Sequence, residues 1–298
     1  MHRVSRNVAF RSIAAVLLAV LVPGTIAGAT AAPVLAAQAS PASGCQRTFV
    51  PAYAWSAAFW THAIDSHPAP SVIILDITGV GAGTAPVPHF QALVGKAHAA
   101  GITILGYSST EYGQRPAAQV EADARNYKAW YQVNGMFLDL TASSTGELGY
   151  YQNLARYIHT AIPASVIWLN PGDFPAPGYM SVGNVVMVFE GSYAGYRQLQ
   201  VPSWASQYDP SRFVNTIYAT PGPDLASAVS LAGIRRAGYL YVTDLPGSPN
   251  PYNALPSYWP QEVAAVAASC TAAATLVAQS NLISGQAKVT AHREGWNN

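Results

Sequence analysis

The feature of this sequence that most constrains its fold is a repeated alternation of short apolar runs with longer helical stretches. Polar or Gly- and Pro-rich loops separate these segments. The apolar runs are Thr48–Ala54, Ser71–Ile77, Ile102–Ser108, Asn134–Asp139, Ser165–Asn170, Asn184–Glu190, Phe213–Tyr218 and Gly238–Asp244. Strands that alternate with helices pair in parallel, so eight such units favour an α/β fold, a single (β/α)8 TIM-type barrel. An open, doubly wound sheet is the alternative, because counting strands cannot prove closure.

The helix candidates between the runs have ordinary lengths. They are Ser56–Ser66, His89–Ala99, Ala117–Tyr131, Leu148–Ala161, Asp224–Arg236 and Gln261–Val277, with a loop-rich crossing at Tyr193–Tyr208. No linker or break in composition divides residues 45–277, so we interpret them as one domain. The chain after residue 39 is about 259 residues long, the usual size of one barrel. Residues 278–298 are polar and aperiodic, which predicts a loosely ordered C-terminal tail.

Residues 1–39 have the pattern of a secretory signal peptide. A basic start precedes an apolar core at Ile13–Val22, and small residues suited to cleavage follow at 27–31 and 37–39. A retained membrane anchor is the alternative interpretation, but the apolar core is too short to span a bilayer permanently. We therefore expect a secreted, extracellular protein with no permanent membrane anchor.

The charge balance excludes several classes of partner. Removing the signal segment removes Arg3, Arg6 and Arg11 and no acid, so the formal net charge falls from +1 to −2. A nearly neutral chain with few charges has no electrostatic footprint for nucleic acid or for anionic lipid. The sequence sets no oligomeric state.

Two cysteines lie near the two ends of the predicted domain, at Cys45 and Cys270. In an oxidising compartment such a pair would form a disulfide that ties the ends together, and two unpaired thiols are the alternative. Two cysteines cannot hold a structural zinc, and the histidines show no metal-binding spacing. The glycines of Gly79–Thr84 lack the third glycine and the helix start of a dinucleotide loop. We therefore expect neither a metal nor an organic cofactor.

Acids and tyrosines gather at the C-terminal ends of the predicted strands. In chain order these residues are Tyr53, Asp76, Tyr107, Glu111, Tyr112, Asp139, Asn170, Glu190, Tyr193, Tyr218 and Asp244. The C-terminal ends of barrel strands meet at one rim, where enzymes with this fold place their active sites. Carboxylates flanked by aromatic rings are typical of a polysaccharide cleft, because sugars stack on rings and two carboxyls flank the scissile bond.

Two acids near the strand ends have a simpler interpretation. Asp173 and Asp244 precede Pro-containing segments and are equally well explained as turn residues. Glu190 is harder to explain in this way, because it ends the apolar run Val185–Phe189 and glutamate is a poor turn former. Asp139 likewise ends a buried run. We therefore favour Asp139 and Glu190 as functional carboxylates.

Several segments at the strand ends together resemble one known family, the spherulin-4-like proteins. The resemblance runs from about Phe49 to Val266, with the motifs in the same order. The segments are Ile104–Tyr107, Tyr112–Pro116, Asn134–Asp139, Leu169–Gly172, Gly178–Met180, Val188–Tyr193, Tyr241–Asp244 and Asn250–Trp259.

The resemblance implies a (β/α)8 glycoside hydrolase that cuts polymers of galactosamine or N-acetylgalactosamine. The family's acids are an Asp-Glu pair that ends the fourth strand and a Glu that ends the sixth. Asp139 and Glu190 match the first and last of these, whereas Leu140 stands in place of the second. Asp76 stands where asparagine is more usual, and Tyr218 stands where histidine is common.

Two hypotheses follow. The first is a secreted glycoside hydrolase in which Asp139 and Glu190 are catalytic and the other rim residues bind the polysaccharide. The second is a carbohydrate-binding or cell-surface protein on the same fold, because Leu140 cannot donate a proton. Against the second, glycoside cleavage needs two carboxyls and two remain; in substrate-assisted schemes the sugar's own acetamide replaces the protein nucleophile. Asp76 and Glu111 are further acids on the predicted rim and are candidates to supply the missing charge.

Overall fold

The computed structural model describes residues 45–270, and each predicted apolar run in this range forms a β-strand. The strands are β1 Arg47–Ala52, β2 Val72–Leu75, β3 Thr103–Ser109, β4 Gly135–Asp139, β5 Val166–Leu169, β6 Val185–Ser192, β7 Phe213–Tyr218 and β8 Tyr239–Val242. The predicted signal peptide (1–39), the tail (278–298) and the domain end at 277 lie outside the described residues.

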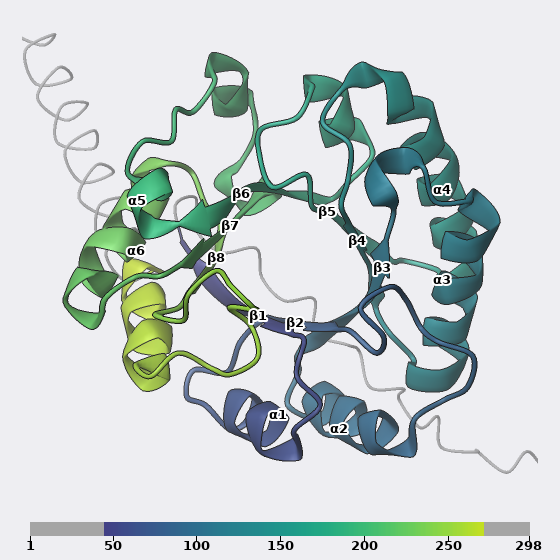
Figure 1. The fold of residues 1–298 in the computed structure, drawn as a ribbon, viewed down its shortest axis with the longest axis horizontal. Coiled ribbons are helices and arrows are strands. Elements are labelled where there is room, and N and C mark those ends of the chain that lie inside the picture. Colours follow the sequence, from purple (N-terminus) through teal and green to yellow (C-terminus); the bar gives the residue numbers. More distant parts are fainter. Residues whose placement is uncertain (1–44, 271–298) are drawn as a thin grey trace, which may run out of the picture. The chain divides into compact units, whose positions relative to one another are not determined.

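The strands close into a barrel (Figure 1). Every strand pairs in parallel with the next one along the chain, and β8 also pairs with β1 through Thr48 and Leu240. Closure confirms the predicted (β/α)8 barrel and excludes the open doubly wound sheet, whose two edge strands would remain unpaired.

Helices surround most of the barrel. They are α1 Ala57–Ile64, α2 Pro88–Ala99, α3 Ala117–Tyr131, α4 Leu148–Ala161, α5 Tyr193–Tyr196, α6 Leu225–Ile234 and a last helix over residues 259–270, with 3₁₀ turns η1 Glu111–Gly113, η2 Thr145–Glu147, η3 Pro177–Ser181, η4 Ser203–Gln207, η5 Pro210–Arg212 and η6 Gly222–Asp224. Between β5 and β7 the connections consist of loops, 3₁₀ turns and the short α5 (Figure 1). Helices α1 to α4 therefore follow β1 to β4, whereas the connections between β5 and β7 are more irregular.

Aromatic side chains fill the inside of the barrel. Phe49 on β1 contacts Trp168 on β5, with ring centroids 5.5 Å apart, although four strand positions separate these strands. Trp168 also contacts Tyr239 on β8 at 4.7 Å. The interior is thus a packed core, as in other barrels of this kind, and a ligand can reach only its open ends.

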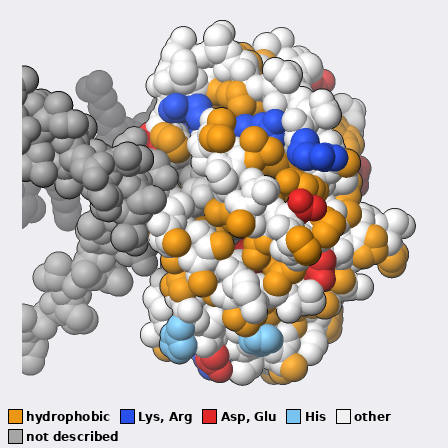
Figure 2. All heavy atoms as spheres, turned by 90° about the vertical axis from the view of Figure 1, so that its left-hand side faces the viewer, with side chains coloured by type: hydrophobic (Ala, Val, Ile, Leu, Met, Phe, Trp, Pro, Cys, Tyr) orange, Lys and Arg blue, Asp and Glu red, His pale blue; other side chains and the backbone are white. Residues whose placement is uncertain are grey.

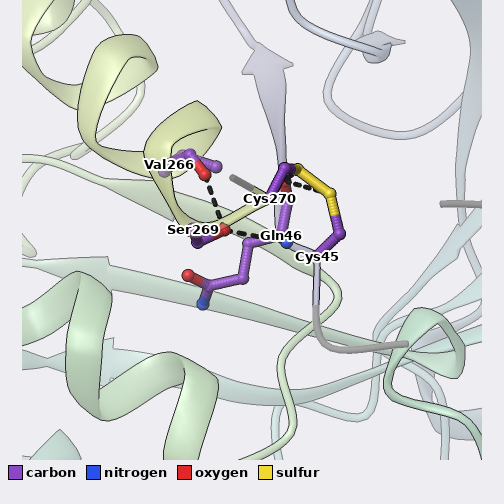
Figure 3. Close-up of a disulfide and its surroundings, with 5 residues drawn as sticks. All are labelled: Cys45, Gln46, Val266, Ser269 and Cys270. Atoms are coloured by element: carbon purple, nitrogen blue, oxygen red, sulfur yellow. Dashed lines mark hydrogen bonds between the residues drawn. A yellow bond between two sulfur atoms is a disulfide. The ribbon is translucent and has the colours of Figure 1, made fainter. Parts of the chain in front are cut away.

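The disulfide predicted from sequence is present. Cys45 precedes β1, Cys270 lies at the end of the last described helix, and the bond joins residues 225 positions apart (Figure 3). Beside it, the Gln46 backbone N–H donates to Ser269 Oγ at 3.0 Å. The bond therefore fixes the last helix to the start of the first strand.

The outer surface over residues 45–270 is mixed in character. Within residues 45–270, no helix is long and apolar enough to cross a bilayer. On the side that carries α5 and α6, apolar and uncharged side chains separate the basic ones (Figure 2).

Candidate active site

The site begins with the alternation of side chains along the strands. Successive residues of a strand point to opposite faces, so a residue two positions beyond an inward-facing core residue also points inward. Asp139 follows Phe137 in this way, and Asn170 follows Trp168. The same count brings Tyr53, Asp76 and Tyr107 to the rim from β1, β2 and β3. The strands therefore aim these side chains at one opening of the barrel.

Glu190 reaches the same opening because of a β-bulge in β6. Met187 pairs with Val214 of β7 and Glu190 pairs with Thr216, so three residues of β6 oppose two of β7. The extra residue reverses the alternation, so that Met187 and Glu190 lie on one face although they are three positions apart. Without the bulge, the carboxylate would point toward the outer helices.

Asn170 joins the two carboxylates. Its Nδ2 donates to Asp139 Oδ1 and to Glu190 Oε2, each at 2.7 Å. The two accepting oxygens therefore cannot lie further apart than twice 2.7 Å. This places two half-buried acids within one sugar's width of each other at the mouth of the barrel.

Three tyrosines complete a closed ring with this group. Tyr107 OH donates to Asp139 Oδ2 at 2.6 Å, and Tyr252 OH donates to Glu190 Oε1 at 2.6 Å. Tyr53 lies between these two phenols, with its ring centroid 5.4 Å from each in edge-to-face contact. We call these six residues the carboxylate ring; they are Tyr53, Tyr107, Asp139, Asn170, Glu190 and Tyr252.

The two carboxyls differ in their surroundings. Burial raises the pKa of Asp139, whereas hydrogen bonds from Tyr107, the Leu140 backbone N–H and Asn170 oppose that rise. Burial also raises the pKa of Glu190, the negative charge of Asp139 raises it further, and only Tyr252 and Asn170 oppose it. Asp139, with three donors that favour its charged form, is therefore the more readily ionised of the two, and Glu190, with two donors and a charged neighbour, is the more readily protonated.

The ring tyrosines remain neutral donors. Burial, then the charge of Asp139, raises the pKa of Tyr107, and burial, then the charge of Glu190, raises the pKa of Tyr252. The pKa of Tyr53 is also raised, by burial first and then by both acids. A phenol that cannot ionise keeps its hydrogen for the carboxylate beside it.

Asp76 adds a third acid at the edge of this group. Its Oδ1 accepts from the backbone N–H groups of Thr78 at 3.1 Å and Gly79 at 2.7 Å, so it also shapes the loop that follows β2. Burial raises the pKa of Asp76, and the charge of Asp139 adds to that rise. The Asp76 carboxyl therefore holds the loop after β2, and its pKa depends on the charge of Asp139 in the carboxylate ring.

Leu140 follows Asp139 directly and adopts an unusual backbone. Its φ is +47°, in the left-handed region that residues with a side chain rarely occupy. Its carbonyl accepts from the Tyr112 N–H at 2.7 Å and from Thr110 Oγ1 at 2.8 Å, which holds the turn. The apolar side chain is 37% exposed at the rim.

The loop that follows β8 brings Tyr252 to the site. Asp244 accepts hydrogen bonds from the backbone N–H and the hydroxyl of Ser257 at 3.1 and 2.5 Å, which closes this loop on itself. Gly247 packs on the ring of Tyr218, so closely that a Cβ would lie 2.6 Å from a ring carbon. Asp244 and Tyr218 thus position the loop, and Asp244 combines the predicted rim location with the turn role considered as its alternative.

Tyr252 is a residue of the site that the strand pattern does not predict. It lies in a Pro- and Asn-rich stretch that has the composition of an ordinary loop. This stretch has no periodicity from which the direction of the Tyr252 side chain could be predicted. The signal that was available is the family motif Asn250–Trp259, which contains it. The contact between these distant segments arises because β6 and β8 both pair with β7, so the loop after β8 reaches Glu190.

Other predicted residues lie apart from the ring. Glu111 and Tyr112 form the exposed turn η1, both with positive φ, and Tyr112 is 56% exposed. Tyr193 begins α5 and lines an open groove of about 470 Å³ against α6, with the Arg197 guanidinium 5.5 Å from its ring centroid. The structure therefore brings together Tyr53, Asp76, Tyr107, Asp139, Asn170 and Glu190, and places Tyr193 on the outer layer.

The chemistry that this arrangement supports is acid-base chemistry. Among the described residues, no group of three or more His, Cys, Asp or Glu side chains could hold a metal ion. The two carboxyls of the site differ in how readily they ionise, a combination that suits protonation of a leaving group beside a developing positive charge. A (β/α)8 barrel with such a pair at its C-terminal rim is a glycoside-hydrolase-like barrel.

Comparison with known proteins identifies the family of this chain. The model of the Spherulin4 family, described as spherulation-specific family 4, matches residues 47–266. The chain belongs to this family, which confirms the resemblance in the sequence motifs.

Individual relatives extend the comparison. The chain is similar to Spherulin-4 of Physarum polycephalum, with 28% identity over 233 residues that cover 74% of this chain and 70% of the relative. Among solved structures, it is similar to Sph3 of Aspergillus clavatus in complex with GalNAc, with 21% identity, a TM-score of 0.66, and coverage of 76% of this chain and 98% of Sph3. A chitinase of Chromobacterium violaceum matches at 10% identity and a TM-score of 0.49, covering 74% of this chain and 99% of the chitinase.

Proposed function

We propose that this protein is a secreted glycoside hydrolase that cleaves exopolysaccharide containing galactosamine or N-acetylgalactosamine. The observation that carries the proposal is the Asp139–Asn170–Glu190 bridge, which holds two acids in unlike surroundings side by side at the barrel mouth. Glycoside hydrolysis requires this pair of groups, an acid for the leaving oxygen and a carboxylate for the anomeric carbon. Leu140 does not remove either one.

The surroundings of the carboxyls assign their roles. Glu190, whose pKa is raised by burial and by the charge of Asp139, donates its proton to the glycosidic oxygen as the bond breaks. Asp139, whose charged form three donors favour against the effect of burial, forms a bond to the anomeric carbon as the glycosidic bond breaks, or orients the substrate's own acetamide to form it. In the second step, the Glu190 carboxylate takes a proton from water, the water oxygen bonds to the anomeric carbon, and the bond formed in the first step breaks, which restores both groups.

The separation of the carboxyls supports retention of configuration. Both accept from one nitrogen at 2.7 Å, which keeps the nearest oxygens well below the roughly 6.5–9.5 Å of inverting enzymes and compatible with the roughly 5–5.5 Å of retaining ones. An inverting reaction would need room for a water molecule between Asp139 and the sugar. Retention is also the outcome if the substrate's own acetamide attacks and Asp139 orients it.

The substrate and the location rest on separate observations. Family membership and the likeness to Sph3, whose structure holds GalNAc, support an amino-sugar polymer. The Cys45–Cys270 disulfide supports an oxidising compartment, in line with the signal-like pattern of residues 1–39. A polysaccharide outside the cell is the partner that fits both observations.

The proposal is tested by incubating the protein with a galactosamine–N-acetylgalactosamine polymer and measuring new reducing ends. Wild type should release them, and Glu190→Gln and Asp139→Asn should each lose about 10³-fold or more of that rate, because each removes one of the two required groups. Glu121→Gln on the outer helix α3 is the matched control and should retain full activity.

A second candidate function, a non-catalytic carbohydrate-binding protein, is favoured by one observation. Leu140, an apolar and exposed residue, occupies the position next to Asp139 where the family has an acid. In that case the protein would bind the polymer without releasing any reducing ends, and Leu140→Glu would create activity that wild type lacks. Turnover by wild type that disappears in Glu190→Gln would exclude it.

A further inference from the structure

Large apolar side chains that are exposed gather on one half of the barrel rim. In the described part of the chain, these side chains are Trp55, Val80, Tyr112, Leu140 and Ile234. Four of the five, all except Ile234, lie in the loops that follow β1, β2, β3 and β4, which are consecutive strands of the barrel. Scattered exposed apolar residues need no explanation, but a contiguous set beside a polar site marks a binding surface.

Backbone contacts join these residues to the carboxylate ring. Leu140 follows Asp139 in the chain, and the Tyr112 N–H donates to the Leu140 carbonyl at 2.7 Å. The Val80 carbonyl in turn accepts from the Ser109 N–H at 2.9 Å and from the buried Arg115 guanidinium at 3.0 Å. The backbone of Val80, Tyr112 and Leu140 therefore adjoins the site, and hydrogen bonds hold it in place.

The backbone holds two of these side chains outward at a cost. Leu140 and Tyr112 have φ values of +47° and +56°, a region in which a side chain is disfavoured and glycine is not. Such strain persists only where the surrounding structure imposes it, and it is concentrated at ligand-binding positions. Glycine at either position would relax the backbone and remove the side chain from the rim.

We propose that Val80, Tyr112 and Leu140 form a platform for further sugar units of the polymer whose scissile bond lies at the carboxylate ring. Sugar rings present apolar C–H faces, which pack against aromatic and aliphatic side chains. Trp55 contacts Phe90 of α2 at 5.1 Å and is not part of this platform. The platform rests on the proposed function, because it names which units of that substrate are bound and where.

The proposal predicts that affinity grows with chain length and that this growth depends on the platform. Binding is measured in the Glu190→Gln background, so that no ligand is cleaved, with α-1,4-linked N-acetylgalactosamine oligosaccharides of two and six units. Leu140→Gly and Tyr112→Gly should each weaken binding of the hexamer about tenfold and leave the dimer nearly unchanged.

A stability measurement separates this effect from misfolding. Both glycine variants should keep or raise the melting temperature, because glycine tolerates the left-handed backbone. Gln132→Gly, at a left-handed position that caps the C-terminal end of α3, is the matched control and should bind both ligands like the parent protein. Ile234→Ala, which removes an exposed apolar residue on α6, should also have no effect on binding.

The outcomes distinguish the platform from the catalytic proposal. Hexamer binding that is equal in the parent and both glycine variants, or that does not exceed dimer binding, would overturn the platform even if wild type hydrolyses the polymer. Loss of hexamer affinity in the variants, combined with no turnover by wild type, would support the platform and exclude the catalytic function.

Discussion

Asn170 has an unusual position at the residue scale, because one amide group serves two acids. The hydrogen bonds that its amide nitrogen donates lower the pKa of Asp139 and of Glu190, against the effect of burial. The amide also fixes the distance between the carboxyls. We regard Asn170 as a positioning residue that sets both the geometry and the protonation of the pair.

Replacing Asn170 by alanine should therefore shift the whole pH–rate profile upward. Both carboxyls lose a donor that favours their charged form, so both pKa values rise and both limbs of the bell-shaped profile move to higher pH. The maximum rate should fall about 10²-fold, since the carboxyls are no longer aligned. A profile that keeps its wild-type position would contradict this role for the amide.

The two phenols allow the acid and the nucleophile to be told apart. Tyr107 donates only to Asp139 and Tyr252 only to Glu190, and each bond lowers the pKa of its carboxyl. Tyr107→Phe should move the acidic limb of the pH–rate profile to higher pH, because Asp139 must be ionised. Tyr252→Phe should move the basic limb to higher pH, because Glu190 must be protonated.

Tyr258→Phe serves as the control for this pair of variants, since its hydroxyl donates to the Thr220 carbonyl and not to an acid. The pH dependence of kcat/KM gives both limbs in one experiment. Shifts in the opposite limbs, with Tyr252→Phe acting on the acidic one, would reverse the assignment of Asp139 and Glu190.

At the scale of the elements, the apolar runs predicted all eight strands, because a strand buried on both faces must be apolar throughout. Period-two alternation also places Tyr53, Asp76, Tyr107, Asp139 and Asn170 on the rim. It fails for Glu190: counting by two from Met187 predicts that Glu190 points outward. The bulge at Val188 depends on packing between β6 and β7. No residue type in this apolar run predicts it.

The disulfide is the second element whose effect can be measured. It closes a loop of 225 residues, so in the chain-entropy description it stabilises the folded state by about 5 kcal/mol, and measured values are often lower. Changing both Cys45 and Cys270 to serine should lower the free energy of unfolding by about 2–5 kcal/mol in a urea titration, without reducing kcat at 25 °C.

A reducing agent is the control for this variant. It should lower the stability of wild type to that of the double serine variant and should not destabilise the variant further. Equal stability of the two proteins without reductant would mean that the bond contributes nothing to the fold.

At the scale of the whole molecule, a buried acid far from substrate should govern the pH dependence of stability. Glu262 on the last helix is fully buried and accepts from the Val242 N–H at 2.7 Å. Burial raises its pKa well above the ordinary value, and the charge of Asp244 adds to this. The folded state thus binds this proton more tightly than the unfolded chain does.

The sign of the effect follows from linkage. A raised carboxyl pKa in the folded state contributes stability below the unfolded pKa of about 4.3, and this contribution is lost as the pH rises. Glu262→Gln keeps an acceptor for Val242 and cannot ionise, so it should melt at the same temperature as wild type near pH 4 and higher than wild type at pH 7. A melting-temperature difference that stays constant from pH 4 to pH 7 would contradict this account.

The whole-molecule arrangement also explains what sequence alone could not supply. Tyr252 and Glu190 are 62 residues apart, and they meet because β6 and β8 both pair with β7. Closure of the barrel then places Tyr252 against Tyr53, which follows β1. Which strand ends face one another across the mouth depends on barrel geometry and not on any local pattern. The carboxylate ring is therefore a property of the closed fold, whereas its individual members on β1 to β5 are visible in the strand pattern.

The most direct test of the account is the stereochemistry of the first product. Proton NMR during early hydrolysis of an N-acetylgalactosamine oligosaccharide reports which anomer forms before mutarotation. We predict that wild type releases the anomer with the substrate's own configuration, because Asp139 and Glu190 are too close for an inverting water. Release of the opposite anomer, or no product at enzyme concentrations that saturate binding, would contradict the assignment of Asp139 and Glu190 as a retaining catalytic pair.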